Sequence, residues 1–137
     1  MDVRVQTFAE ALDTFTYLVT VDMAALSAQL DSRLIDGLEN GKAQKFEYTL
    51  ELCWKAIKAA LKQREGIDEA SPKKVIKAFY LGGYLTEDDY LALIQAVDDR
   101  NKLSHIYEPE EFKAILARLP SYAGLMQRVH AQLHAHN

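Results

Sequence analysis

The sequence predicts an all-α protein, an up-down bundle of four long helices with one additional short helix. Two observations indicate this fold class. Apolar residues recur at spacings of three and four along most of the chain, which is the period of amphipathic helices. No segment of useful length alternates apolar and polar residues in the way that a half-buried strand requires.

The first two helices are predicted from two apolar stripes. The first stripe comprises Phe8, Leu12, Phe15, Val19, Leu26 and Leu30, although the β-branched residues of "TYLVTVD" weaken its pattern. We expect Gly37 and Gly41 to mark the end of this helix. A second helix is expected from about Gln44 to Arg64. Its apolar stripe comprises Phe46, Leu50, Cys53, Trp54, Ile57 and Leu61.

Capping signals delimit the next two helices. Ser71-Pro72 is typical of a helix start, with serine as the N-cap and proline in the first position. We expect this short helix to end at Gly82-Gly83. Thr86 then caps a helix that runs to about His105, and acidic residues 87–89 suit its positive N-terminal dipole.

The last helix is expected to begin at Glu108-Pro109. Pro120 lies within it and must produce a kink or an interruption, because proline lacks the N–H that the helix needs. The C-terminal sequence "HAQLHAHN" is expected to fray.

The 137 residues are enough for one compact domain, so we expect a single helical domain over residues 1–137. No apolar run approaches the roughly 20 residues that span a bilayer. The N-terminus lacks the basic and apolar regions of a secretory signal, which predicts a cytoplasmic location without a membrane partner. The single Cys53 cannot form an internal disulfide.

Charge is distributed unevenly along the chain. Residues 42–77 contain nine lysines and arginines against five acidic residues, whereas residues 86–111 contain eight acidic residues against two basic ones. The net charge of −4 argues against nonspecific nucleic-acid binding. Any RNA is therefore expected to follow the basic segment.

The segment "RNKLSHIY" places several polar groups at the end of a helix that begins as "YLALIQAV". Arg100 can donate paired hydrogen bonds to a phosphate, and His105 can transfer protons near neutral pH. With Asn101 and Ser104 orienting them, these residues suffice for metal-free RNA cleavage. One histidine per chain must serve as both acid and base, and a two-fold dimer would supply two copies.

A structural interpretation of the same segment stays open. Arg100 would then pair with a carboxylate, Asn101 would cap a backbone group, and His105 would favour the negative end of the helix dipole.

Other polar residues suggest no metal site and no cofactor. Glu47 and Glu51 lie one turn apart, but no HExxH-type partner accompanies them, so a solvated or ion-paired face is expected. Glu47 and Glu51 could orient Arg100 if the bundle points them at the cleft. Trp54 is expected in the core. His130 and His134 are four residues apart without an apparent third ligand.

Three segments together resemble the HEPN superfamily, over about residues 5–130. They are "KFEYTLELCWKAIKAAL", "SPKKVIKAF" and "RNKLSHIY". The similarity is greatest to the branch of nucleotidyltransferase substrate-binding proteins, or HepT-type toxins. Its Arg-x4-His-x-Tyr motif is matched by Arg100, His105 and Tyr107, with Asn101 as the polar residue after arginine. One departure is lysine at positions 73, 74 and 77, where some arginine is expected.

The resemblance implies a HEPN-like four-helix bundle that forms a homodimer, with Arg100 and His105 of both chains lining a cleft. It implies an endoribonuclease toxin of a toxin–antitoxin pair. A minimal nucleotidyltransferase, the antitoxin, would neutralise it by transferring AMP to the motif tyrosine, here Tyr107. The alternative is a non-enzymatic subunit that binds a substrate or nucleotide for a two-component nucleotidyltransferase. The sequence leaves both open, as well as a purely structural bundle.

Overall fold

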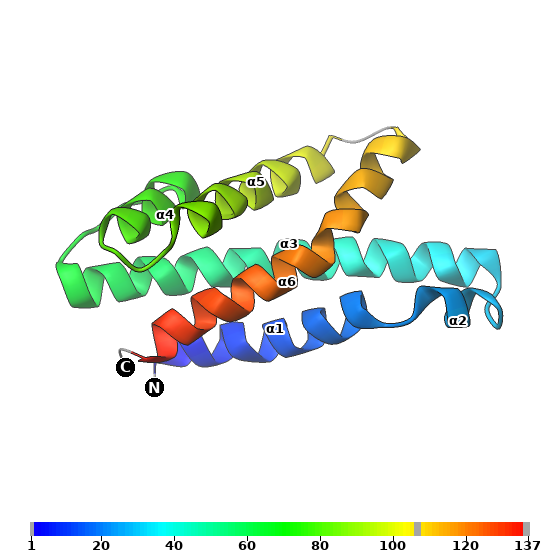
Figure 1. Ribbon diagram of the computed structural model, residues 1–137, viewed down its shortest axis with the longest axis horizontal. Helices are drawn as coiled ribbons and strands as arrows, with labels where there is room; N and C mark the ends of the chain where they lie inside the picture. The colour runs from blue at the N-terminus through cyan, green and yellow to red at the C-terminus, as the bar shows by residue number, and fades with distance from the viewer. Residues whose placement is uncertain (1, 106–107, 136–137) are drawn as a thin grey trace.

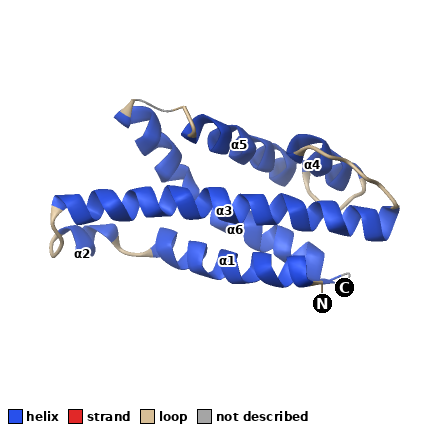
Figure 2. Cartoon of the chain, turned by 180° about the vertical axis from the view of Figure 1, so that it is seen from behind, coloured by secondary structure: helices blue, strands red, loops and turns tan. Residues whose placement is uncertain are grey.

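Every regular element in the described part of the chain, residues 2–105 and 108–135, is a helix in this computed structural model (Figures 1 and 2). The prediction of an all-α bundle is therefore confirmed. The helices are α1 (Val3–Thr20), α2 (Met23–Ser27), α3 (Ser32–Glu65), α4 (Pro72–Leu81), α5 (Glu87–Leu103) and α6 (Pro109–Ala135). Within these ranges, no helix is long and apolar enough to cross a membrane.

Helix α3 is the central element, since it contacts each of the other five helices. Figure 1 shows α4 and α5 on one side of α3 and α1 on the other, with α6 crossing between them. The two ends of the described chain lie close together at one end of the molecule (Figure 2). This arrangement packs the last turns of α5 against both α3 and α6.

The first two predicted helices are divided differently in the structure. Helix α1 ends at Thr20, where the β-branched residues weaken the pattern. Asp22 then caps the five-residue helix α2 by accepting a hydrogen bond from the Ala25 amide. Asp31 then caps α3, which passes through Gly37 and Gly41 without a break. The predicted helix end at these glycines and the start near Gln44 are wrong.

The reason is energetic. A glycine inside a helix costs only about 1 kcal/mol relative to alanine, so it weakens a long helix without ending it. The glycine that does end α3 is Gly66, which has the left-handed φ of 68° typical of a helix C-terminus.

The predicted boundaries of α4 and α5 are close to those observed. Pro72 is the first residue of α4, although the Ser71 side chain makes no capping hydrogen bond with the described residues. The Thr86 side chain accepts a hydrogen bond from the Asp89 amide at 3.1 Å, as its predicted capping role requires. Helix α5 ends at Leu103, two residues before the predicted His105.

Helix α6 contains Pro120 and bends in its first half (Figure 1). Of the two predicted alternatives, the kink is observed, and the helix continues through Pro120 without an interruption. The predicted fraying is wrong as far as Ala135, because Val129 and Leu133 are buried and anchor the last turns. Helix packing thus outweighs the polar composition of this tail.

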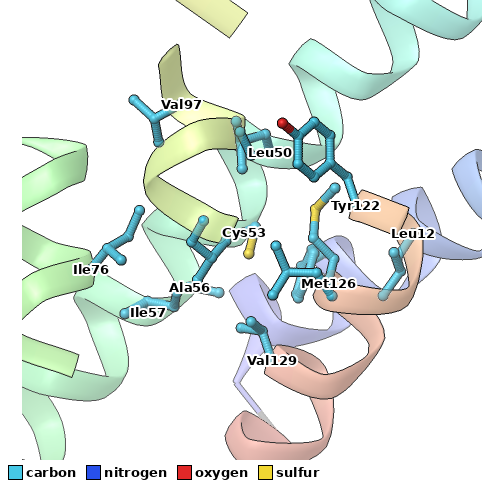
Figure 3. Packing of buried hydrophobic residues seen from close by; sticks show 14 of the residues in the cluster. Leu12, Leu50, Cys53, Ala56, Ile57, Ile76, Val97, Tyr122, Met126 and Val129 are labelled. Carbon is cyan, nitrogen blue, oxygen red and sulfur yellow. The ribbon is translucent and has the colours of Figure 1, made fainter. Parts of the chain in front are cut away.

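The core is formed by apolar faces from α1, α3, α4, α5 and α6. Figure 3 shows part of it, with side chains from α1, α3 and α6 meeting around Cys53 and Met126. Cys53 is fully buried, and burial raises the pKa of its thiol. This rigid core determines the positions of the polar residues at its edge.

Candidate functional site at the end of helix α5

An ion pair between α5 and α3 forms the centre of the candidate site. The Nη2 atom of Arg100, in the last turn of α5, lies 2.8 Å from Oε2 of Glu51 in the middle of α3. About a third of each side chain is exposed. The Nε atom of Arg100 is buried and makes no hydrogen bond to the described residues. The guanidinium therefore keeps donor capacity beyond its contact with Glu51.

Three groups surround the Glu51 carboxylate. Besides Arg100, the Trp54 indole N–H donates a hydrogen bond to Oε2 at 3.0 Å, and Nζ of Lys55 lies 3.3 Å from Oε1. Partial burial tends to raise the pKa of Glu51. The hydrogen bonds from Trp54 and Lys55 and the charge of Arg100 more than offset burial, so this pKa lies below its ordinary value. Glu51 is consequently ionised at neutral pH and fixes the position of Arg100.

His105 lies two residues beyond the end of α5 and is exposed. Its backbone N–H donates to the Lys102 carbonyl at 2.8 Å, so the chain keeps a helix-like turn after α5 ends. Asn101 and Ser104 are also exposed. These three residues and Arg100 share one end of α5, while Tyr107 lies outside the described residues.

A buried network, which the sequence did not reveal, centres on the residue before Arg100. Asp99 is only 2% exposed and accepts two hydrogen bonds from Arg118 of α6, at 2.7 and 2.8 Å. It also accepts a hydrogen bond from the Tyr122 hydroxyl at 2.5 Å. In Figure 3 this hydroxyl points away from Met126, toward the side where Leu50 lies. The network joins α5 to α6 one residue before the candidate phosphate-binding arginine.

The pKa values of this network reflect its burial. Burial raises the pKa of Tyr122, and the Asp99 carboxylate raises it further. The hydrogen bonds to Asp99 likewise raise the pKa of Arg118 above its already high value. Asp99 therefore pairs with a permanent cation and a neutral phenol. A sequence signal existed, because Asp99 follows buried Ala96 by three residues and so falls on the inner face of α5.

A cavity of about 610 Å³ borders this site on the α3 side. Trp54 and Lys55 line it, so it begins beside the Glu51 cluster. Trp54 contacts the core yet is only partly buried, which differs from the expectation that it is simply a core residue.

A second cavity, of about 620 Å³, lies at the end of α5 and contains acidic side chains. Asp36, Glu47 and Glu108 line it together with Leu103. Glu47 thus faces a different surface feature from Glu51, although the two lie one turn apart on α3. Among the described residues, no three His, Cys, Asp or Glu side chains are grouped as metal ligands, and His130 and His134 stack on each other.

The fold and the site define a small helical-bundle protein with a polar cluster at the end of one helix and basic groups beside it. The chain belongs to the family described as nucleotidyltransferase substrate binding protein like, whose model matches residues 4–135. The proposed resemblance to this family is therefore confirmed.

A crystal structure supports the same assignment. It is that of a protein from Thermus thermophilus, which is 34% identical and superposes with a TM-score of 0.79. The match covers 92% of this chain and 98% of the Thermus protein. No protein of curated function is similar enough to match.

Proposed function

We propose that this protein is a metal-independent endoribonuclease, the toxin of a pair whose antitoxin is a minimal nucleotidyltransferase. The observation that carries the proposal is the placement of Arg100 by the Glu51 ion pair, five residues before the exposed His105 at the same end of α5. A fixed guanidinium and an accessible imidazole are the two groups that cleavage through the ribose 2′-OH requires.

The reaction follows from these two groups. Arg100 binds the non-bridging oxygens of the scissile phosphate. His105 removes the proton of the 2′-OH, the 2′ oxygen attacks phosphorus, and the bond from phosphorus to the 5′ oxygen breaks. A protonated imidazole donates a proton to that leaving oxygen. The products are a 2′,3′-cyclic phosphate and a 5′-OH, and no metal or cofactor enters the balance.

A homodimer would supply the acid and the base separately. Each chain contributes one histidine, His105, to the proposed site. The two proton transfers are usually performed by different groups. Two copies related by a two-fold axis would bring two such residues to one phosphate. Asn101 and Ser104, exposed on the same end of α5, would orient the substrate or the imidazole.

Neutralisation is proposed to occur at Tyr107. AMP on its phenol would add a negative phosphate close in sequence to Arg100 and His105, and would compete with RNA for the guanidinium. Co-expression with the nucleotidyltransferase should add the mass of one or more AMP units, mapped to Tyr107. The matched variant Tyr107→Phe should acquire no mass, and it should remain a nuclease that the transferase fails to neutralise.

The decisive test is cleavage of a defined single-stranded RNA by the purified protein in EDTA. Arg100→Ala and His105→Ala should each reduce the rate at least about a hundredfold, the lower end of general acid–base contributions. Circular dichroism should show an unchanged helical fold. Lys113→Ala, at an exposed position of α6, is the matched control and should cleave normally. Cleavage that disappears in EDTA and returns with a divalent ion would exclude this mechanism.

The alternative is a non-enzymatic subunit that presents a substrate or nucleotide to a nucleotidyltransferase. The family description favours it, and Arg100 is already neutralised by Glu51. If purified protein binds RNA or nucleotide but all preparations leave RNA intact, this alternative becomes the better account.

A further inference from the structure

The cavity beside the candidate site has a composition that suits a nucleic-acid strand. Four basic side chains line it, those of Arg4 on α1 and of Lys55, Lys58 and Lys62 on α3. Trp54 of α3 lines it as well. Two carboxylates, Asp2 and Asp68, also line it. The cations are therefore in excess, in a protein whose net charge is −4.

The two carboxylates are already engaged. Asp2 caps α1 by accepting a hydrogen bond from the Arg4 amide at 2.7 Å. Asp68 lies 2.9 Å from Nζ of Lys58, which also donates to the Glu69 carbonyl at 2.6 Å. Lys58 is thus a structural residue of the cavity wall. Lys62 and the Arg4 side chain are exposed and form no ion pair with the described residues within 4.0 Å.

The basic residues form a line that begins at the candidate site. Glu51, Lys55, Lys58 and Lys62 follow one another at spacings of four, three and four, so they lie on one face of α3. The distance from Glu51 to Lys62 along the helix is about 16 Å, from the rise of 1.5 Å per residue. This length exceeds that of one nucleoside monophosphate. Arg100 stands at the Glu51 end of the line.

Trp54 adds a surface for a base. Its indole N–H is directed to Glu51, and the side chain is partly exposed to the cavity. An aromatic side chain among cations is the usual combination for single-stranded nucleic acid, because bases stack on the ring while the phosphates contact the cations. Stacking of this kind is typically strong enough to be measured by substitution of the aromatic residue.

We propose that this cavity binds the single-stranded RNA on one side of the scissile phosphate. One base stacks on Trp54, and the phosphates run along Lys55, Lys62 and Arg4 toward Arg100. The inference rests on the proposed ribonuclease function, because it names where that enzyme's substrate lies.

Trp54 is the only tryptophan in the chain, so tryptophan fluorescence reports on this cavity and on the Glu51 carboxylate to which the indole donates. The probe is a six- to eight-nucleotide RNA with 2′-O-methyl groups, which cannot be cleaved through the 2′-OH. Titration into the full-length protein should quench the fluorescence to saturation. The affinity should fall steeply with salt, as expected for phosphate contacts. AMP should bind at least about tenfold more weakly, because it offers one phosphate group instead of several.

Two charge reversals test the cavity, with a control on the same helix. Lys62→Glu and Arg4→Glu should each weaken RNA binding about tenfold and reduce its salt dependence. Arg4→Glu places an acid in the first turn of α1, where the helix dipole favours it, so lost binding would not come from unfolding. Lys45→Glu makes the same charge change on α3 outside this cavity and should alter binding less than about twofold.

The outcomes separate this inference from the proposed activity. Quenching that responds to Lys62→Glu, without cleavage of unmodified RNA, would support the cavity and contradict the ribonuclease. The opposite outcome is cleavage that requires Arg100 and His105 but is unaffected by Lys62→Glu, with no quenching of Trp54 fluorescence. It would support the ribonuclease activity and overturn the proposal that RNA binds in this cavity. An equal effect of Lys45→Glu, or AMP binding as tight as RNA binding, would also overturn it.

Discussion

Arg118 of α6 donates two hydrogen bonds to Asp99 of α5, at 2.7 and 2.8 Å, and Asp99 immediately precedes Arg100. The geometry of the candidate site therefore depends on a contact between α5 and α6 as well as on the ion pair with α3. Because Asp99 is almost fully buried, its charge must be compensated by its partners. This pairing makes the end of α5 a rigid support for Arg100.

The first prediction concerns Asp99→Asn. The variant removes the charge of the buried partner and leaves Arg118, about a third exposed, without its counter-charge, so the free energy of unfolding should fall by about 2–3 kcal/mol. Urea denaturation measures this loss. Asp98→Asn is the matched control, because the Asp98–Lys73 pair is about half exposed and should contribute less than about 1 kcal/mol. Equal effects of the two variants would contradict a special role for the buried network.

The second prediction concerns Tyr122 and alkaline pH. The pKa of this buried phenol is raised in the folded protein, whereas in the unfolded chain it returns to about 10. Above that pH the unfolded state loses a proton that the folded state retains, so the free energy of unfolding falls as pH rises. The fall should be less steep in Tyr122→Phe. Urea denaturation between about pH 9 and 11 tests this, and identical slopes in both proteins would refute it.

The third prediction separates positioning from binding at Glu51. Glu51→Gln removes the charge that neutralises Arg100 and loosens the guanidinium. RNA should bind as tightly as before or more tightly, while kcat should fall about tenfold or more because the phosphate contact is less well oriented. Glu47→Gln, one turn earlier on α3, should leave both quantities unchanged. A higher KM with an unchanged kcat would show that Glu51 contributes to RNA binding and not to the orientation of Arg100.

Local signals predicted much of the fold. The Ser71-Pro72 start, the Thr86 cap and the apolar stripe from Phe8 to Val19 correspond to observed elements, because each depends on neighbouring residues in the chain. Leu26 and Leu30, which belong to the same predicted stripe, lie beyond the end of α1 and outside the core. Gly37 and Gly41 misled the prediction. Sequence alone does not reveal that Asp31 caps α3 earlier, nor that the packing of this helix outweighs two modest glycine penalties.

The residues of the candidate site were also predicted in part from the sequence. Arg100 and His105 followed from the motif and its resemblance. A contact with Arg100 was expected only if the bundle pointed Glu47 and Glu51 at the cleft, and the structure brings Glu51 against Arg100. Their chemical roles stay predictions. The Asp99 network was missed because Arg118 and Tyr122 follow it by 19 and 23 residues, and only the crossing of α5 and α6 determines which polar groups meet.

The fourth prediction uses the misleading glycines. Apart from the neighbouring backbone of α3 itself, no atom of the described residues lies within 4 Å of a Cβ built at Gly37 or Gly41, and neither glycine has a positive φ angle. Alanine should therefore stabilise the protein by about 0.5–1 kcal/mol at each position. Gly66→Ala is the contrasting control and should destabilise, because its φ is 68°. Thermal or urea unfolding measures these changes. If Gly37→Ala and Gly41→Ala also lowered the free energy of unfolding, a continuous α3 would be contradicted.

The fifth prediction tests whether two chains share the proposed site. If both copies of His105 act on one phosphate, a dimer with a single His105→Ala chain is inactive. Random assembly of equal amounts of wild type and His105→Ala then leaves about a quarter of the dimers fully intact. Activity, measured against a wild-type-only preparation of the same total concentration, should fall to about that fraction.

Co-expression of differently tagged chains provides the mixed dimers, and light scattering measures the assembly state. The matched control mixes wild type with Lys113→Ala, which changes an exposed α6 residue and should leave activity near its full value. A composite site also requires the active species to be a dimer, twice the 15.5 kDa of one chain. A fall to about half would mean that each chain works alone, since half of all chains then remain competent whatever their neighbours. In that case acid and base must both come from one chain, and His105 would need a second proton-transferring group within its own subunit.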